Sequence, residues 1–317
     1  MARQLLRFVA SRAVQVIAVM FFVSLGVFVM TRAVPGSPAS IYLGPDASAE
    51  QVARMEARLG LDQPMYVQYI DWLGQVLQGG LGRSLIRNEP VTVMIMEALP
   101  VTLQISAFAM LFTVLIGVPI GVASAVNQYT WKDYVATVSA LIAFSSPQFF
   151  TGILLILLFS IQYNFFPALG FVSMADHFLT GLEYTVLPGF ALGAAYWGVI
   201  VRMQRSSMLD VLNQEFVDAA RARGIRERSV IYSHALRNAL IPVITIAGIQ
   251  IGWLLNGSIL IERVFDLPGI GDLLITAIFQ RDYAVVQGVV LFIAFVFVVV
   301  NLLVDIVYAL IDPRIRY

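Results

Sequence analysis

The sequence predicts an all-α integral membrane protein with six transmembrane helices, both termini cytoplasmic, and a helical outer segment between spans one and two. Two observations carry this prediction. Of the 317 residues, 59% are hydrophobic and only 13% are charged, whereas an ordinary soluble domain has about 25% charged residues. Six stretches of at least 18 residues also lack Asp, Glu, Lys and Arg, and a helix of about 20 residues crosses the hydrocarbon core. These stretches are 13–31, 98–131, 134–175, 184–201, 238–261 and 283–304.

Composition also excludes several classes of function. Acidic and basic residues number 20 each, so the formal net charge is zero, which argues against a general nucleic-acid binder. The chain has no cysteine, which excludes disulfides, thiolate metal sites and cysteine nucleophiles. The only lysine, Lys132, follows Trp131, whereas a phosphate-binding loop for ATP needs Gly-Lys-Ser/Thr. We therefore expect no enzyme activity, metal or cofactor in this chain; if ATP drives its work, another chain hydrolyses it.

The first span lies in residues 1–31 and follows Arg3, Arg7 and Arg12, as the core of a signal peptide would. Its apolar run is long for a signal peptide and no small-residue cleavage site follows, so we expect it to remain as a span. With both termini inside, the inner segments hold 13 of the 20 basic residues. Because basic residues concentrate in cytoplasmic loops, this distribution sets the predicted orientation.

The extracytoplasmic segment 32–97 is predicted to be helical in two places. Ser48 and Gln51 fit a capping box at the start of a helix near 49–59. A second helix is expected over 65–77. The segment either packs as a cap on the outer face or serves as a docking or gating element, and the sequence leaves both interpretations open.

Residues 98–317 are expected to form a core of five spans. The first break in this core is Ser145-Ser146-Pro147-Gln148, which interrupts a helix expected over 135–160, before an outer loop. Proline removes a helical hydrogen bond. An ordinary kink against a neighbouring helix is favoured over a polar break that lines a passage. If a passage exists, its candidate lining is Ser145, Ser146 and Gln148.

The cytoplasmic loop 202–237 is predicted to carry a short helix over 214–224, begun by Asn213 and ended by Gly224. Acidic residues near its start and arginines near its end suit the helix dipole. Three apolar side chains share one face of this helix: Phe216, Val217 and Ala220. Such a face could lie on the bilayer surface or in a groove of another protein, and its small size favours the groove.

This loop resembles a known family. Asp218-Ala219-Ala220 followed by Gly224 resembles the EAA motif of permease subunits in bacterial ABC importers, with Asp in place of Glu. Pro242 follows that glycine by 18 residues, which is similar to the dipeptide/oligopeptide branch, including nickel, glutathione and some opine and oligosaccharide systems. The resemblance covers most of the chain and is closest to the first permease of the pair. It continues in Gly60-Leu61-Asp62-Gln63-Pro64, Gly79-Gly80-Leu81-Gly82, Arg202-Met203-Gln204-Arg205, Pro268-Gly269, Arg281-Asp282-Tyr283 and Asp312-Pro313-Arg314-Ile315-Arg316.

The resemblance implies a type I ABC importer permease fold in the bacterial inner membrane. It implies a subunit of an ATP-driven importer that moves di- or oligopeptides, or a similar small solute, by alternating access. The implied partners are a second homologous permease subunit, one or two ATPase subunits that hold ATP and Mg, and an extracytoplasmic substrate-binding protein. The short loop helix is then the coupling helix that docks on the ATPase. Its residues are Glu215, Phe216, Val217, Asp218, Ala219, Ala220, Arg221, Arg223 and Gly224.

The connection between the last two spans is a candidate outer gate. Leu273–Phe279 reads as a short apolar helix after a turn, and it would lie across the outer mouth. A packed connecting loop is the alternative. The candidate gate residues are Glu262, Pro268, Gly269, Arg281 and Asp282, with Glu262 and Arg281 as salt-bridge partners.

The alternative function is a stand-alone secondary transporter or channel. Such proteins often carry buried coupling charges and internal repeats. Only Asp305 is a candidate for such a charge, and a structural ion pair with Arg314 or Arg316 is the favoured role for it. A membrane-embedded enzyme would need a metal-ligand cluster or a nucleophile–base pair in the spans, and the sequence offers neither.

Overall fold

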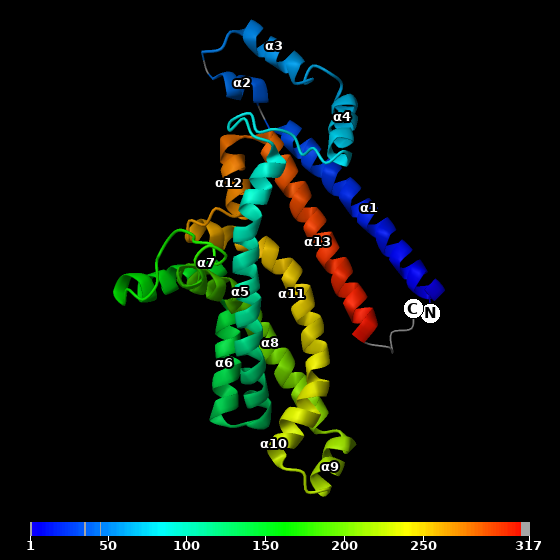
Figure 1. Cartoon of the computed structure of the whole chain (residues 1–317), viewed down its shortest axis with the longest axis vertical. Helices are drawn as coiled ribbons and strands as arrows, with labels where there is room; N and C mark the ends of the chain where they lie inside the picture. The colour runs from blue at the N-terminus through cyan, green and yellow to red at the C-terminus, as the bar shows by residue number, and fades with distance from the viewer. Residues whose placement is uncertain (1, 35, 45, 312–317) are drawn as a thin grey trace. The chain divides into compact units, whose positions relative to one another are not determined.

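The computed structural model describes the backbone of residues 2–34, 36–44 and 46–311, and the side chains of 14–34, 36–44, 46–254 and 258–304. Over these ranges the chain is helical and has no strand beyond an isolated bridge between Arg83 and Pro90. Figure 1 shows the course of the helices. They are α1 (Ala2–Ala33), α2 (Pro38–Leu43), α3 (Ala49–Arg58), α4 (Met65–Leu77), α5 (Val91–Val126), α6 (Trp131–Ser145), α7 (Gln148–Leu155), α8 (Phe178–Leu212), α9 (Glu215–Ala222), α10 (Glu227–Ser229), α11 (Leu236–Val264), α12 (Ile270–Gln280) and α13 (Tyr283–Ile311), with π-helical segments η1 (Ile156–Gln162) and η2 (Val230–Ala235).

Five helices are long and apolar enough to cross a membrane, and a bent pair supplies up to one more. The five are α1, α5, α8, α11 and α13. Four of them contain a whole predicted stretch, whereas the stretch 98–131 extends beyond the end of α5 at Val126. The single helix expected over 135–160 is wrong. There α6 and the α7–η1 helix meet at an angle of 106°.

The break lies at Ser146-Pro147. Ser146 adopts an extended backbone conformation, with ψ of 128°, because a following proline disfavours the helical region. Pro147 is the N-cap of α7 and has no N–H to donate. This angle of 106° is larger than the ordinary kink that the sequence favoured. The chain does not continue along the axis of α6 but turns away from it.

The segment after α1 is helical, as predicted. Ser48 Oγ accepts from Gln51 N at 3.3 Å and Gln51 Oε1 accepts from Ser48 N at 2.9 Å, so the capping box of α3 is confirmed. The second expected helix is α4, with the predicted bounds. Helix α2 was missed, although Ser37 followed by a first-turn proline is a recognised helix start.

Helix α4 packs on α1. The hydroxyl groups of Ser24 and Tyr69 lie 2.9 Å apart, and the ring of Phe28 contacts Tyr69 and Trp72 at centroid distances of 5.3 and 5.9 Å. No residue of α3 is buried. One part of the segment is therefore fixed to the first span, while the side chains of α3 are exposed or only partly buried.

The helices form two compact units. The first unit contains residues 1–100 and 268–302, and the second contains 101–267 and 303–311. The first is built around an apolar cluster from the start of α5, α12 and the start of α13. Its buried members are Val91, Met94, Ile95, Ala98, Ile270, Leu273, Ala277, Val285 and Val289.

The second unit is organised around α8, whose glycines and those of α5 let helices approach closely. A Cβ at Gly121 of α5 would lie 2.6 Å from Gln204 Cβ, and one at Gly193 of α8 would lie 2.8 Å from the carbonyl oxygen of Ala109. On another side of α8, a Cβ at Gly198 would lie 2.5 Å from the carbonyl oxygen of Ala140 in α6. We call these close contacts the glycine seams. Membrane helices often pack through small residues, because in lipid the hydrophobic effect does not drive helices together.

The side chain of Asp305 and all of Arg314 and Arg316 lie outside the described residues, as do the side chains of Arg3, Arg7 and Arg12. The ion pair expected for Asp305 therefore stays a prediction, and so does the orientation of the two termini.

Candidate functional site

The short helix expected in the 202–237 loop is present as α9. It is shorter than predicted, with eight residues, or about 12 Å. Asn213 does not begin it but ends α8, and Gln214 occupies the N-cap position in extended conformation without a side-chain cap. Asn213 was a reasonable cap by residue type, but α8 continues to Leu212, about three turns beyond the end of its predicted apolar stretch at residue 201.

The end of α9 at Gly224 is confirmed. Gly224 has φ of +76°, its N–H donates to Arg221 O at 2.9 Å, and Ile225 N donates to Ala220 O at 3.3 Å. This pair of bonds is the Schellman motif. A Cβ on Gly224 would meet nothing within 4 Å, so glycine is needed here for its backbone conformation alone.

One side of α9 faces the interior of its own unit. Val217 is fully buried and Ala220 is 7% exposed. They pack in an apolar cluster whose other buried members are Val122, Ala125, Met208, Val211, Val230, Ile231, Ala235 and Ala239. We expected Phe216, Val217 and Ala220 to form one face that docks in a groove of another protein. This expectation is wrong for Val217 and Ala220, which pack inside their own unit. Val217 and Ala220 are three positions apart, so they lie on the same face of the helix, and that face points into the apolar cluster.

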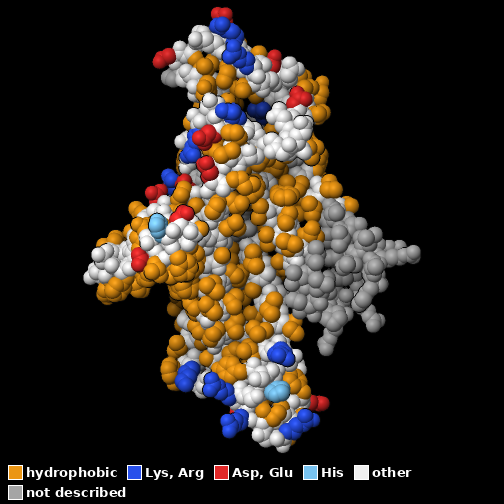
Figure 2. Space-filling view, in the orientation of Figure 1, with side chains coloured by type: hydrophobic (Ala, Val, Ile, Leu, Met, Phe, Trp, Pro, Cys, Tyr) orange, Lys and Arg blue, Asp and Glu red, His pale blue; other side chains and the backbone are white. Residues whose placement is uncertain are grey.

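The opposite side of α9 is exposed. Phe216 keeps 40% of its surface exposed, and Glu215, Asp218, Ala219 and Arg223 are exposed as well. Phe216, Ala219 and Arg223 are spaced three and four apart, so they share one face. Basic side chains gather at the end of the unit that carries α9 and α10 (Figure 2). The outward surface thus combines one large apolar side chain with mixed charge.

Arg221 fastens α9 to α10. Its Nη2 and Nε donate to the two carboxylate oxygens of Glu227 at 2.9 and 3.3 Å, and its Nη1 donates to Asp218 Oδ1 at 3.4 Å. Hydrogen bonding to Glu227 raises the pKa of the Arg221 guanidinium above its ordinary value. The predicted dipole role of Arg221 is thus supplemented by an exposed ion-pair network.

A buried ion pair lies close to this loop and was missed from the sequence. Arg205 of α8 donates from Nε and Nη2 to the two carboxylate oxygens of Asp133 in α6, at 2.7 and 2.8 Å. The carboxylate also accepts from Ser124 Oγ of α5 and from Tyr129 N at 3.0 Å. We call this group the Asp133 clamp. It joins α5, α6 and α8 just before α8 leads into α9.

The sequence held only a weak signal for the clamp. Asp133 and Arg205 are 72 residues apart, so no helical spacing relates them. Both stand at the ends of apolar stretches, where charges normally face water or headgroups. Only the packing of α6 on α8 shows that Asp133 is buried, with 4% of its side chain exposed.

The candidate pathway residues cluster at the break between α6 and α7. Ser145 is exposed, whereas Ser146 and Gln148 are partly buried. Ser146 Oγ donates to Ile142 O at 2.8 Å, and Gln148 Nε2 donates to Leu192 O of α8 at 3.4 Å. Ser146 and Gln148 thus stabilise the bend, and Ser145 is the one of the three that is exposed.

The candidate gate residues contribute to two local structures. Glu262 is fully buried and accepts from Thr102 Oγ1 at 2.7 Å. Asp282 caps the start of α13: its carboxylate accepts from Ser84 Oγ and from Val285 N, the latter at 3.5 Å. The salt bridge expected between Glu262 and Arg281 stays a prediction.

The expected short helix of this connection exists as α12, and it begins three residues earlier than predicted. Gly269 is its N-cap, directly after Pro268. Its C-cap, Arg281, has φ of +56°, a left-handed conformation in which a non-glycine residue is uncommon. The turn expected at Pro268-Gly269 lies slightly earlier, at Phe265-Asp266, and Gly269 is extended. A second sharp turn follows α12.

Two family models match the chain. Residues 117–317 match the family described as "Binding-protein-dependent transport system inner membrane component", and residues 5–106 match the N-terminal model of the same membrane component. Together they span both structural units.

Curated relatives match over nearly the full length. A peptide transport system permease protein of Brucella abortus is 41% identical over 309 residues, which is 98% of this chain and 98% of the relative. The glutathione transport system permease protein GsiC of Salmonella choleraesuis is 40% identical over 313 residues, 99% of this chain and all of the relative.

Proposed function

The chain belongs to the family of binding-protein-dependent transport system inner membrane components, and from this premise we propose how its structure serves ATP-driven import. It is a multi-pass inner-membrane permease of an ABC importer. Its relatives are named for peptide and glutathione transport. We propose di- or oligopeptides, or a peptide-like solute such as glutathione, as the transported class.

The observation that carries the mechanism is the two-sided packing of α9. Its inner side is fixed in the apolar cluster by Val217 and Ala220, while Phe216, Ala219 and Arg223 face outward. We propose that this outward face docks in a groove of the ATPase subunit, with Phe216 as the apolar anchor and the surrounding charges as the rim. An anchored aromatic ringed by polar groups is the usual composition of an interaction hot spot.

Motion of the ATPase would reach the spans through short connections. Two residues, Asn213 and Gln214, separate α9 from α8. The Asp133 clamp and the glycine seams bind α8 to α5 and α6. A displacement of α9 therefore moves a packed group of helices together, as alternating access between inward-open and outward-open populations requires.

The two termini are proposed to be cytoplasmic, with α9 on the same side. The supporting observation is the concentration of basic side chains around α9 and α10 (Figure 2), because cytoplasmic loops are enriched in Lys and Arg. The segment with α2, α3 and α4 is then extracytoplasmic, where a binding protein delivers the solute.

Ser145 and the bend beside it are proposed to face the passage shared with a second, homologous permease. An irregular backbone at membrane depth is tolerated where it lines a cavity or is buried in protein. Helix α12 is proposed to close the outer end, together with Glu262 and Arg281. Disulfide locking of Phe279→Cys, which replaces a side chain that is 80% exposed, to the partner permease should block transport; unimpaired transport would contradict a gating role.

Docking can be tested by cross-linking, because the chain has no native cysteine. In the assembled importer, Ala219→Cys should cross-link to an ATPase subunit carrying cysteines around its groove. Gln51→Cys on exposed α3 is the matched control and should not. Cross-linking of both variants, or of neither, would contradict the assignment of α9.

The complex itself is tested by tagging the N-terminus, extracting gently from native membranes and identifying the co-purifying chains by mass spectrometry. A second permease and chains with phosphate-binding loops are expected, and a bound periplasmic protein would identify the solute. A homogeneous homo-oligomer without an ATPase would instead support a stand-alone transporter.

A further inference from the structure

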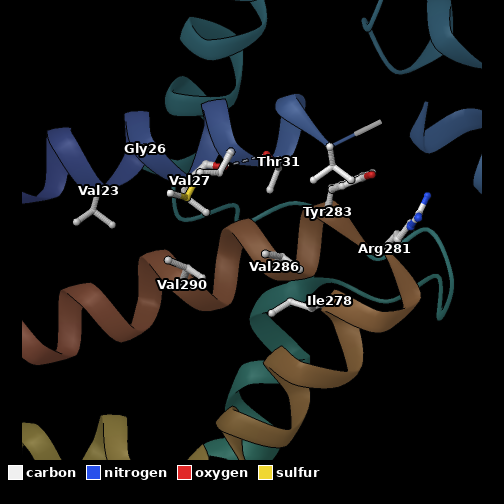
Figure 3. A pocket seen from close by; sticks show the side chains of 11 residues that line it. Val23, Gly26, Val27, Thr31, Ile278, Arg281, Tyr283, Val286 and Val290 are labelled. Atoms are coloured by element: carbon white, nitrogen blue, oxygen red, sulfur yellow. Dashed lines mark hydrogen bonds between the residues drawn. The ribbon is translucent and has the colours of Figure 1, made fainter. Parts of the chain in front are cut away.

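A pocket of about 510 Å³ lies in the first unit, between α1, the end of α12 and the start of α13. Figure 3 shows α1 and α13 side by side with the lining side chains directed between them. The size falls within the usual range of small-molecule sites. Arg281 and Tyr283 at one end of the pocket belong to the family-like motif described above, whereas its apolar lining on α1 and α13 does not.

The pocket wall is almost entirely apolar along its length. Val23, Val27 and Met30 line it from α1, and Val286 and Val290 line it from α13. Gly26 also lies in this wall, and a Cβ there would meet nothing within 4 Å. An apolar hollow beside lipid gives water no hydrogen-bond partners and leaves its lining atoms without contacts if it stays empty. A hydrocarbon chain in the hollow would supply the missing contacts of its lining atoms.

One end of the pocket is polar and built from fixed groups. Arg281 and Tyr283 stand at this end in Figure 3. Gln287 Nε2 donates to Thr31 Oγ1 at 2.6 Å, which joins α13 to α1 there. Tyr283 is only 8% exposed, and among the described residues its hydroxyl has no hydrogen-bond partner. A buried phenol normally finds an acceptor, so a group supplied from outside the chain is indicated.

The charge at this end suits an anion. Arg281 lines the pocket, while the carboxylate of neighbouring Asp282 is occupied by Ser84 Oγ and Val285 N. Arg32, near the end of α1, is not a lining residue, and its guanidinium lies over the ring of Phe28, 5.2 Å from the centroid. A guanidinium matches the geometry of a phosphate group and can bind it through two parallel hydrogen bonds.

The dimensions of the pocket fit a lipid in one leaflet. Its lining on α1 extends from Val23 to Val34, a rise of about 16 Å, which is about half of a 30 Å hydrocarbon core. Arg281 lies just before the apolar span that begins at Tyr283, at the level where headgroups begin.

We propose that this pocket binds one membrane phospholipid, with an acyl chain between α1 and α13 and an anionic headgroup against Arg281 and the Tyr283 hydroxyl. The bound lipid fills the space between the first and last spans and completes the packing of this part of the first unit. It is a structural ligand and is distinct from the transported solute.

The test uses the whole importer complex in nanodiscs that contain phosphatidylglycerol with a photoactivatable diazirine in its acyl chain. After irradiation, adducts are located by peptide mapping and are expected within 23–34 and 286–290. Gly26→Leu adds a side chain to the pocket wall, at a position where its Cβ meets nothing within 4 Å. It should lower these adducts about tenfold, as expected for an affinity loss near 1.4 kcal/mol. Gly74→Leu, at a glycine of α4 with equally open surroundings, is the matched control and should leave them unchanged.

The headgroup is tested by Arg281→Gln, compared with phosphatidylcholine carrying the same diazirine. Removing one cation at the membrane surface is worth about 1 kcal/mol, so the preference for phosphatidylglycerol should fall about fivefold. Equal adducts in the wild type and Gly26→Leu would overturn the proposal. So would wild-type complexes in which α1 and α13 cross-link to the partner permease instead of lipid, because protein would then fill the pocket.

Discussion

Removing one partner of the Asp133 clamp tests whether this buried pair holds α5, α6 and α8 together. In Asp133→Asn the new amide directs a donor at the guanidinium of Arg205, and the charge that accepted four hydrogen bonds is lost. Breaking a buried ion pair in this way costs about 3–5 kcal/mol. Arg205 keeps 27% of its side chain exposed and can recover some hydration, so we expect the lower end, about 3 kcal/mol.

The free energy of unfolding is measured by SDS titration of the purified protein in mixed micelles, followed by circular dichroism. Asp218→Asn is the control, because the Asp218–Arg221 contact is 3.4 Å long and exposed on both sides, and should cost less than about 0.5 kcal/mol. A double-mutant cycle with Arg205→Met isolates the pair and should give a coupling energy of about 2 kcal/mol. A loss below about 0.5 kcal/mol for Asp133→Asn, or additive effects in the cycle, would refute the reasoning.

Three further predictions follow from local geometry. Gly224→Leu places a side chain at φ of +76°, at a cost of about 1 kcal/mol or more; membrane insertion should persist while solute-stimulated ATPase activity is lost, and normal transport would count against the loop assignment. Gly121→Leu puts a Cβ 2.6 Å from Gln204 Cβ and 2.8 Å from a backbone oxygen, so it should lower the free energy of unfolding by about 3 kcal/mol in the same SDS titration. Gly26→Leu, where an added Cβ meets nothing within 4 Å, should not lower it. Ser48→Ala removes the capping box and should destabilise α3 by about 1 kcal/mol, seen as faster amide exchange in α3 alone; slower transport or global unfolding would show that α3 does more than cover the surface.

The sequence was most informative where structure follows local rules. Apolar stretches located α1, α5, α8, α11 and α13, because a span must be long and uncharged whatever it packs against. The capping box of α3 and the glycine end of α9 were also predicted, since both depend on residues only a few positions apart.

The errors arose where packing decides. Hydrophobicity measures the length of an apolar stretch and contains no information on its direction, so the 106° turn at Ser146 appeared only as a proline break. The direction depends on how α7 packs against other helices. At Gly152, for example, an added Cβ would lie only 3.0 Å from the Phe265 ring. The clamp was missed for the same reason, because its partners are distant in sequence. The roles of Ser145 and of the outer connection stay predictions, since they depend on a second permease.

The two-sided packing of α9 has a consequence for how such importers diverge. Substitutions at Val217 and Ala220 must be matched within the chain, by changes at contacting core positions such as Val122 or Met208, whatever ATPase is used. Substitutions at Phe216 and Ala219 are free of that constraint and should instead be matched in another gene. A chimera that borrows only the outward residues of α9 from a relative should therefore accept that relative's ATPase, whereas transplanting the whole helix would disturb the recipient's own core.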